Sequence, residues 1–158
     1  MFPFLVRAAT PEDVATLTDM RVAFLKEIAE QYPDQSVDDA QLRATLTLYF
    51  RDKLMSGAFH AWLAQKEGHI IGTSGLVFFD RPPSISSPSG RDAYVMNMFT
   101  LPSHRGRGVA SALLKATLSF VETTSASRVF LHATPQGRSL YERFGFVPGH
   151  EEMELFFR

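Results

Sequence analysis

The chain contains no cysteine, and this absence removes three kinds of chemistry at once. It excludes a disulfide framework, a thiolate zinc site and a cysteine nucleophile. It is compatible with a reducing compartment, and we expect a cytoplasmic protein. No uninterrupted run of about 18 apolar residues is present, so we expect no membrane-spanning segment. The first residues lack the basic start and long apolar stretch of a signal peptide, and we expect none.

An excess of charge of one sign is also lacking. Sixteen Lys and Arg residues stand against seventeen Asp and Glu, which gives a formal net charge of -1 at pH 7. Proteins that bind nucleic acid generally carry a basic excess, so we expect no nucleic-acid partner. What is present is an ordinary globular composition, 45% hydrophobic and 21% charged in 158 residues. This predicts one domain over residues 1–158.

Hydrophobic periodicity predicts four helices, at residues 11–30, 38–57, 108–124 and 136–144. Thr10 and Asp13 have the spacing of a capping box, and Ser36 and Asp39 are expected to cap the second helix. Strand-like runs occupy residues 5–8, 59–65, 69–79, 94–101 and 128–133, and further strands are expected at 146–147 and 153–157. Strands that alternate with helices in the second half indicate a mixed α/β fold.

Residues 81–92 are expected to form a long loop, because they contain three prolines, four serines and a glycine. Loops of this length inside a compact domain are usually functional or mobile. The loop is interpreted as a lid or rim in which Arg91 offers charge to an acidic acceptor, or as a flexible hairpin tip.

The segment from Thr100 to Ser111 is the most informative part of the sequence. A buried strand runs into a turn with Gly106 and Gly108, and an amphipathic helix follows at once. A helix N-terminus presents unpaired N–H groups and about +0.5 of a charge, and glycines let the backbone approach an anion closely. This pattern predicts a diphosphate site flanked by Arg105 and Arg107. The Gly-Lys-Ser/Thr of a P-loop and the third glycine of a dinucleotide fingerprint are both missing. The alternative is a tight connection that binds nothing.

Arg105-x-x-Gly108-x-Ala110 after a strand resembles the acetyl-CoA-binding motif of the GNAT superfamily of N-acetyltransferases. A second signature of that family is similar to Asn-x-x-Ala-x-x-Leu-Tyr-x-x-x-Gly-Phe. The chain has Thr134, Gly137, Leu140, Tyr141, Gly145 and Phe146 at those positions, so four of the six match. Thr134 replaces the Asn, where it is expected to cap the helix, and Gly137 replaces the Ala.

The resemblance implies a mixed, mostly antiparallel sheet flanked by about four helices, with two parallel central strands that splay apart. It implies an N-acetyltransferase that moves an acetyl group directly from acetyl-CoA to an amine of a small molecule or peptide, without a metal. The backbone of the central strand would pair with the pantetheine arm, and the turn would hold the diphosphate. The cofactor-binding residues implied are Met98, Phe99, Thr100, Arg105, Gly106, Arg107, Gly108, Val109, Ala110 and Ser111.

The resemblance places Tyr141 where family members hold the proton donor for the leaving thiolate. A tyrosine pKa of about 10 against about 8.5 for a thiol permits this transfer. The alternative is a tyrosine that only packs.

The sequence assigns no general base. Family members commonly use a carboxylate on the central strand, and residues 94–100 contain none. Asn97 could orient a water, and His132 could shuttle a proton or serve a structural role. The other candidates, Glu30, Tyr32 and Asp92, are expected to be solvated surface groups.

Two further readings of function stay open: a CoA-binding sensor or interaction module without catalysis, and an acyltransferase for longer acyl chains. If residues 153–157 form an edge strand, their apolar side chains could support a homodimer.

Overall fold

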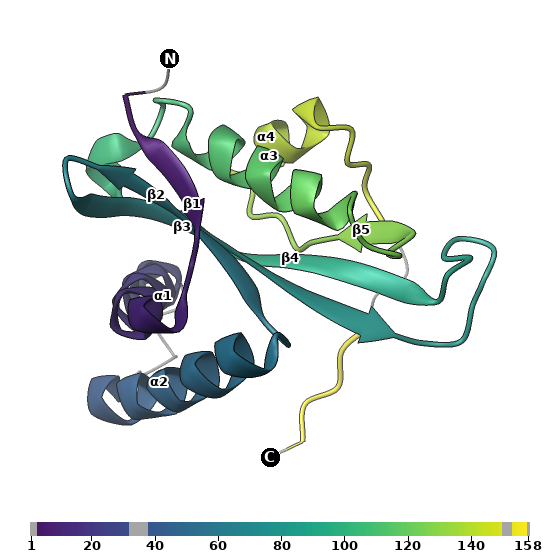
Figure 1. Cartoon of the computed structure of the whole chain (residues 1–158), viewed down its shortest axis with the longest axis horizontal. Coiled ribbons are helices and arrows are strands. Elements are labelled where there is room, and N and C mark those ends of the chain that lie inside the picture. Colours follow the sequence, from purple (N-terminus) through teal and green to yellow (C-terminus); the bar gives the residue numbers. More distant parts are fainter. Residues whose placement is uncertain (1–2, 32–37, 150–152, 158) are drawn as a thin grey trace.

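The computed structural model describes residues 3–31, 38–149 and 153–157. Five strands form one sheet in the order β1-β2-β3-β4-β5 (Figure 1). Neighbouring strands are antiparallel, except that β4 and β5 are parallel. The strands are β1 (Leu5–Ala8), β2 (His60–Lys66), β3 (His69–Asp80), β4 (Arg91–Thr100) and β5 (Arg128–Phe130). The predicted mixed α/β fold with a mostly antiparallel sheet is confirmed.

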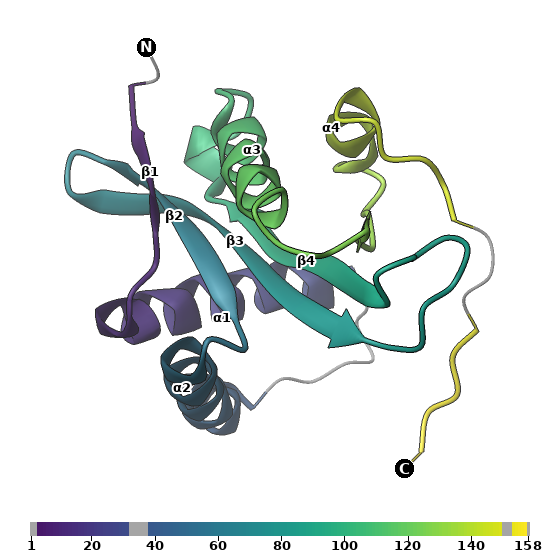
Figure 2. The same cartoon turned by 45° about the vertical axis from the view of Figure 1, so that its right-hand side comes forward.

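Helices cover both faces of this sheet, so the molecule has three layers (Figure 2). One face carries α1 (Val14–Glu30) and α2 (Asp39–Ser56), and the other carries α3 (Val109–Val121) and α4 (Arg138–Arg143). The sheet separates two hydrophobic cores. Leu17, Phe50 and Phe59 centre the core beneath α1 and α2. Trp62, Leu113 and Leu114 belong to the core beneath α3.

Local sequence explains where most helices begin and end. The backbone N–H of Thr10 donates to Asp13 Oδ2 at 2.8 Å, so the predicted capping contact forms, on a short 3-10 turn at Pro11–Asp13 that precedes α1. The cap expected at Asp39 is wrong, because Asp38 accepts from the Gln41 N–H and Asp39 is already helical. Ser36 lies outside the described residues. Gly57 ends α2 with φ of +71°, a conformation that favours glycine.

The C-terminal strands are where the sequence prediction was wrong. β5 ends at Phe130 rather than near residue 133, and the described residues 146–149 and 153–157 contain no strand. A strand needs a neighbour that accepts its hydrogen bonds, and the only described partner of β5 is β4, over three residues. Met153, Leu155, Phe156 and Phe157 are exposed instead. The homodimer contact suggested for residues 153–157 depended on an edge strand, and these residues do not form one.

Candidate active site

The two parallel strands at the centre of the C-terminal half separate after a short paired stretch. β4 and β5 pair at Asp92 with Arg128, at Ala93 with Val129 and at Tyr94 with Phe130. β4 continues for six more residues to Thr100, while β5 ends at Phe130. The edge of β4 beyond Tyr94 is paired with β3 on one side only within the described chain. We call this opening between the strands the split; it is the separation that the family resemblance implied.

A β-bulge lies in β4 beside the split. Gly75 of β3 pairs with Met96, and Thr73 pairs with Phe99, so two residues of β4 oppose one residue of β3. Asn97, at the bulge, has a φ of +54°. Its carbonyl accepts from the Thr73 hydroxyl at 3.1 Å. Its buried side-chain amide has no hydrogen-bond partner in the part of the chain that the structure describes. Bulges re-aim the backbone and often occur at active sites.

Asp92 closes the other end of the split. Its side chain is fully buried, and Oδ2 lies 2.6 Å from the Arg81 guanidinium and 2.8 Å from that of Arg128. Burial raises the pKa of Asp92, but the Ser87 hydroxyl and the two arginines outweigh burial and hold this pKa below its ordinary value. The expectation of a solvated surface carboxylate is therefore wrong. Asp92 ties the β3–β4 loop to β5 and is not available as a base.

The glycine-rich turn after β4 presents a run of free backbone N–H groups. Gly106 and Gly108 have φ of +71° and +82°, and left-handed residues of this kind occur in the backbone nests that bind anions. Gly108 is the N-cap of α3, and its carbonyl accepts the first bond of that helix, from Ala112. The N–H groups of residues 106–111 donate to no acceptor within the described ranges. Such a run at a helix N-terminus is suited to a phosphate group.

The two arginines of this turn are in different situations. Arg105 Nε donates to the Thr100 carbonyl at 3.0 Å, and its terminal nitrogen pairs with Glu27 of α1 at 2.6 Å. The Arg105 N–H donates to the Pro102 carbonyl, so the run of free amides begins at Gly106. Arg107 is exposed and forms no ion pair with any described carboxylate. Arg105 therefore fixes the turn against α1, whereas Arg107 is open to solvent.

The side chains of the expected pantetheine strand pack into the protein. Met98 packs against the α3 core, and the buried Phe99 ring lies 5.6 Å from the ring of Phe24. Thr100 is also buried. Only the backbone of these residues is available to a ligand in the split.

Tyr141 of α4 is 9% exposed and lies in the α3 core, with its ring 5.9 Å from that of Phe146. Burial raises the pKa of the Tyr141 phenol, so this group is a neutral donor at physiological pH. α4 begins at Arg138, and a turn that starts at Thr134 leads into it: the Thr134 Oγ1 accepts from the Gly137 N–H at 3.2 Å, and the Thr134 carbonyl accepts from the Arg138 N–H at 3.1 Å. Thr134 therefore caps this turn, whereas the N-cap residue of α4 itself is Gly137.

The α1–α2 face brings further side chains toward the split. Phe24 contacts Phe99, and the rings of Tyr49 and Phe50 lie 5.6 Å apart in an edge arrangement. Phe50 is buried in the core beneath α1 and α2. Tyr94 and His132 interact through the phenol oxygen and Nδ1, 2.9 Å apart. Glu30 is exposed at the end of α1, and Tyr32 lies outside the described residues.

Sequence reasoning missed Arg21 on α1. Its guanidinium lies 5.4 Å from the Phe24 ring and close enough to Tyr49 and Tyr94 to interact electrostatically with both. Arg91, expected to face an acidic acceptor, instead pairs with Asp80 at 3.6 Å and covers the Phe78 ring. The sequence did contain a signal for Arg21, because it is a charged residue at a position of the first helix that faces the rest of the protein.

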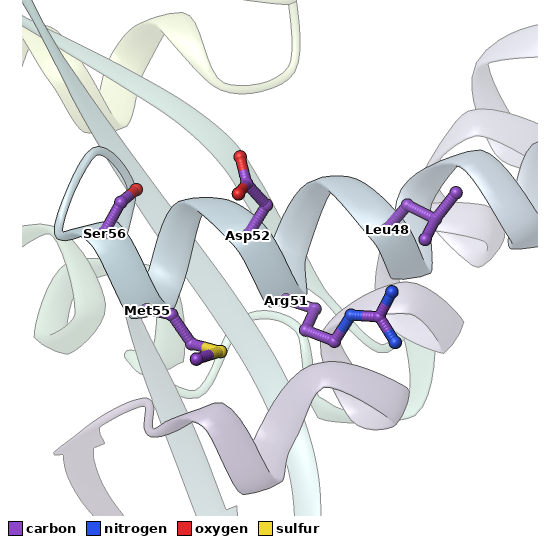
Figure 3. Close-up of a pocket in the computed structure, with 5 residues that line it drawn as sticks. All are labelled: Leu48, Arg51, Asp52, Met55 and Ser56. Atoms are coloured by element: carbon purple, nitrogen blue, oxygen red, sulfur yellow. The ribbon is translucent and has the colours of Figure 1, made fainter.

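Other surface features do not form a comparable site. A depression on α2 is lined by Leu48, Arg51, Asp52, Met55 and Ser56 (Figure 3). All five come from one helix, so the split contributes nothing to it. In the described ranges, no group of three or more His, Asp or Glu side chains is arranged to hold a metal ion. None of the helices in those ranges has the length and apolarity needed to cross a membrane.

Comparison with known proteins gives the family. The Acetyltransferase (GNAT) family profile matches residues 20–146, which include the split, the glycine turn and Tyr141. The chain belongs to the GNAT family of acetyltransferases. A predicted acetyltransferase from Clostridium acetobutylicum, solved with acetyl-CoA, has 28% identity and a TM-score of 0.84 over 97% of this chain and 96% of its own. A GCN5-related N-acetyltransferase from Ralstonia eutropha has 24% identity and a TM-score of 0.85 over 97% and 98%.

One curated relative also matches. N-acetyltransferase 8 of Rattus norvegicus is 34% identical over 89 residues. The match covers 54% of this chain and 38% of the rat protein, so this GNAT chain matches well under half the length of that relative.

Proposed function

We propose that this GNAT protein transfers an acetyl group from acetyl-CoA directly to an amine of a small molecule or peptide. The free N–H groups of residues 106–111 carry the proposal. They gather six donors and the positive end of the α3 dipole at one end of the split, which suits the paired phosphates of CoA. The acetyl-CoA in the Clostridium acetobutylicum relative supports this choice of substrate.

The split is proposed to hold the pantetheine arm of acetyl-CoA. Beyond Tyr94, the backbone of β4 is unpaired on the side of β5 within the described residues, so an extended pantetheine arm can add to it as a further strand. Met98 and Phe99 contribute backbone groups, because the Met98 side chain packs against the α3 core and the buried Phe99 ring lies against Phe24. The thioester would then lie near the bulge at Asn97.

Tyr141 is proposed as the acid. In direct transfer, the amine nitrogen attacks the thioester carbonyl carbon, and the intermediate collapses with cleavage of the C–S bond. The departing thiolate takes the proton of the Tyr141 phenol, and the amine nitrogen releases its proton to solvent, from which Tyr141 is protonated again. Because burial raises the pKa of Tyr141, the phenol is neutral and holds this proton at physiological pH. No described carboxylate lies on β4 beside the split to accept the amine proton, except the ion-paired Asp92.

A glycine substitution tests the binding step. Gly108 has a left-handed φ and lies within the run of free amides, so Gly108→Val is expected to weaken CoA binding at least about 10-fold. Isothermal titration calorimetry with CoA measures this directly.

Gly57→Ala is the matched control. Gly57 has a similar φ of +71° with open space around it, but it lies at the end of α2, away from the turn. This variant should bind CoA as the wild type does. An unchanged CoA affinity in folded Gly108→Val would contradict the proposed site. If CoA binds but no amine in a broad panel releases thiol, the protein is a CoA-binding module instead.

A further inference from the structure

Arg21 is a half-buried cation without a carboxylate beside it. Within the described ranges it forms no ion pair and no hydrogen bond, and its ring contact is with Phe24. Every other half-buried arginine in those ranges pairs with an acid. These pairs are Arg7–Asp13, Arg43–Asp19, Arg43–Asp39, Arg91–Asp80 and Arg128–Asp92. The fold thus neutralises its half-buried arginines and leaves Arg21 as the exception.

This exception has an energetic meaning. Burial lowers the pKa of Arg21, while Tyr94 and Tyr49 act in the opposite direction. An arginine nevertheless remains charged at physiological pH. A partly desolvated charge without a partner destabilises the folded state, whereas a methionine of similar length would not. The presence of Arg21 at this position, despite its cost to stability, is explained if an anion from outside the chain binds to its guanidinium.

The surroundings of Arg21 place it at the closed end of the split. Tyr94 is the last residue of β4 that pairs with β5, and its hydroxyl is bonded to His132. Tyr49 approaches from α2. Arg21 of α1, Tyr49 of α2 and Tyr94 of β4 are therefore close enough to interact electrostatically. The two helices α1 and α2 cover the face of the sheet opposite to α3 (Figure 2). The phosphate-binding turn belongs to the N-terminus of α3.

We infer that Arg21 binds an oxyanion, a carboxylate or a phosphate, carried by the amine acceptor. This inference rests on the proposed function, because it identifies the chemical class of that acceptor. A guanidinium forms two parallel hydrogen bonds with either anion. The phenols of Tyr49 and Tyr94 lie close enough to interact electrostatically with the Arg21 guanidinium itself. Acceptors that carry only positive charge, such as polyamines, would be repelled. The acceptor is therefore an amine that also carries a carboxylate or a phosphate.

Matched amines test this in an acetyl-transfer assay. The pairs are phenylalanine with phenylalaninamide, and ethanolamine phosphate with ethanolamine. The anionic member of the preferred pair should have a kcat/KM at least about 10-fold higher. Arg21→Met should remove that preference through KM for the amine, with KM for acetyl-CoA unchanged. Arg51→Met, at an exposed arginine on α2, is the control and should keep the preference (Figure 3).

A second measurement does not need turnover. The 15N–1H signal of Arg21 Nε, assigned by its loss in Arg21→Met, is followed during titration with N-acetylphenylalanine, N-acetylphenylalaninamide and inorganic phosphate. We expect a shift with at least one anion and none with the amide. No shift with either anion at millimolar concentration, or an equal shift with the amide, would overturn the inference.

The two proposals can fail separately. A shift of the Arg21 signal without acetylation of any amine would leave the anion site and remove the transferase. Acetylation without any anion preference, together with an Arg21 signal that no anion shifts, would support the transferase and contradict the anion site. Arg21→Met should melt no lower than the wild type, because it removes an unpaired charge. A clear fall in Tm would indicate a structural role for Arg21 and contradict the inference.

Discussion

At the scale of single residues, Tyr141 owes its proposed role to its environment. The side chain is almost completely buried in the α3 core, and this burial raises its pKa. A phenol that ionises only at high pH stays in the donor form wherever the amine substrate begins to be neutral. The same burial that packs the ring therefore keeps the proton available for a leaving thiolate.

Tyr141→Phe should lower kcat roughly 100-fold while KM for acetyl-CoA changes little, because only the proton donor is lost. The neutral phenol is the active form and its pKa is raised, so wild-type kcat should show no loss from this group below about pH 10. Steady-state kinetics across pH measures both effects. The ring volume is retained, so Tm should stay near that of the wild type. Equal kcat in the two proteins would show that Tyr141 only packs.

Two residues show what the sequence could not reveal. Asp92 looks like a loop-end carboxylate in the sequence, but it is fully buried, and Arg81 of the β3–β4 loop and Arg128 of β5 both pair with it. Arg21 looks like an ordinary helical arginine, and only the packing of α1 against β4 shows that it lacks an acid. Both properties depend on residues distant in sequence, which local patterns do not specify.

At the scale of elements, the sequence predicted the helix ends that depend on the backbone conformation of single glycines. The end of α2 at Gly57 and the start of α3 at Gly108 both follow from backbone conformation. The strands predicted at residues 146–147 and 153–157 are absent because a strand depends on a distant pairing partner, which apolar residues alone do not supply. The bulge at Asn97 was not predicted either, since it depends on the register between β3 and β4.

Gly75 of β3 is required by the packing of the Phe59 ring against it. A Cβ at this position would lie 2.6 Å from Phe59 Cζ and 3.3 Å from Asn97 Cβ, and Phe59 is fully buried. Gly75→Ala should therefore lower the free energy of unfolding by about 1–3 kcal/mol, because the core must be displaced. Urea denaturation measures the change. Gly149→Ala, where a Cβ meets open space, should change stability by no more than about 0.5 kcal/mol. Equal stabilities of the two variants would refute the packing argument.

At the scale of the whole molecule, the sheet separates two approaches to the split. The glycine turn and Tyr141 lie with α3 and α4 on one face, and Arg21 lies with α1 and α2 on the other (Figure 2). Asp92 holds the strands together at one end, and the bulge and the free edge of β4 lie beyond it. This arrangement allows acetyl-CoA and an amine to enter from different sides and meet where the strands separate.

The backbone amides themselves test this account most directly. In a titration of 15N-labelled protein with CoA, followed by 1H–15N correlation spectra, the signals of residues 106–111 should show the largest changes. Signals of residues 98–100 should move with them as the pantetheine arm adds to β4. If CoA at millimolar concentration leaves the amides of residues 106–111 unmoved, or shifts only signals elsewhere, the proposed diphosphate site and the acetyl transfer that depends on it are contradicted.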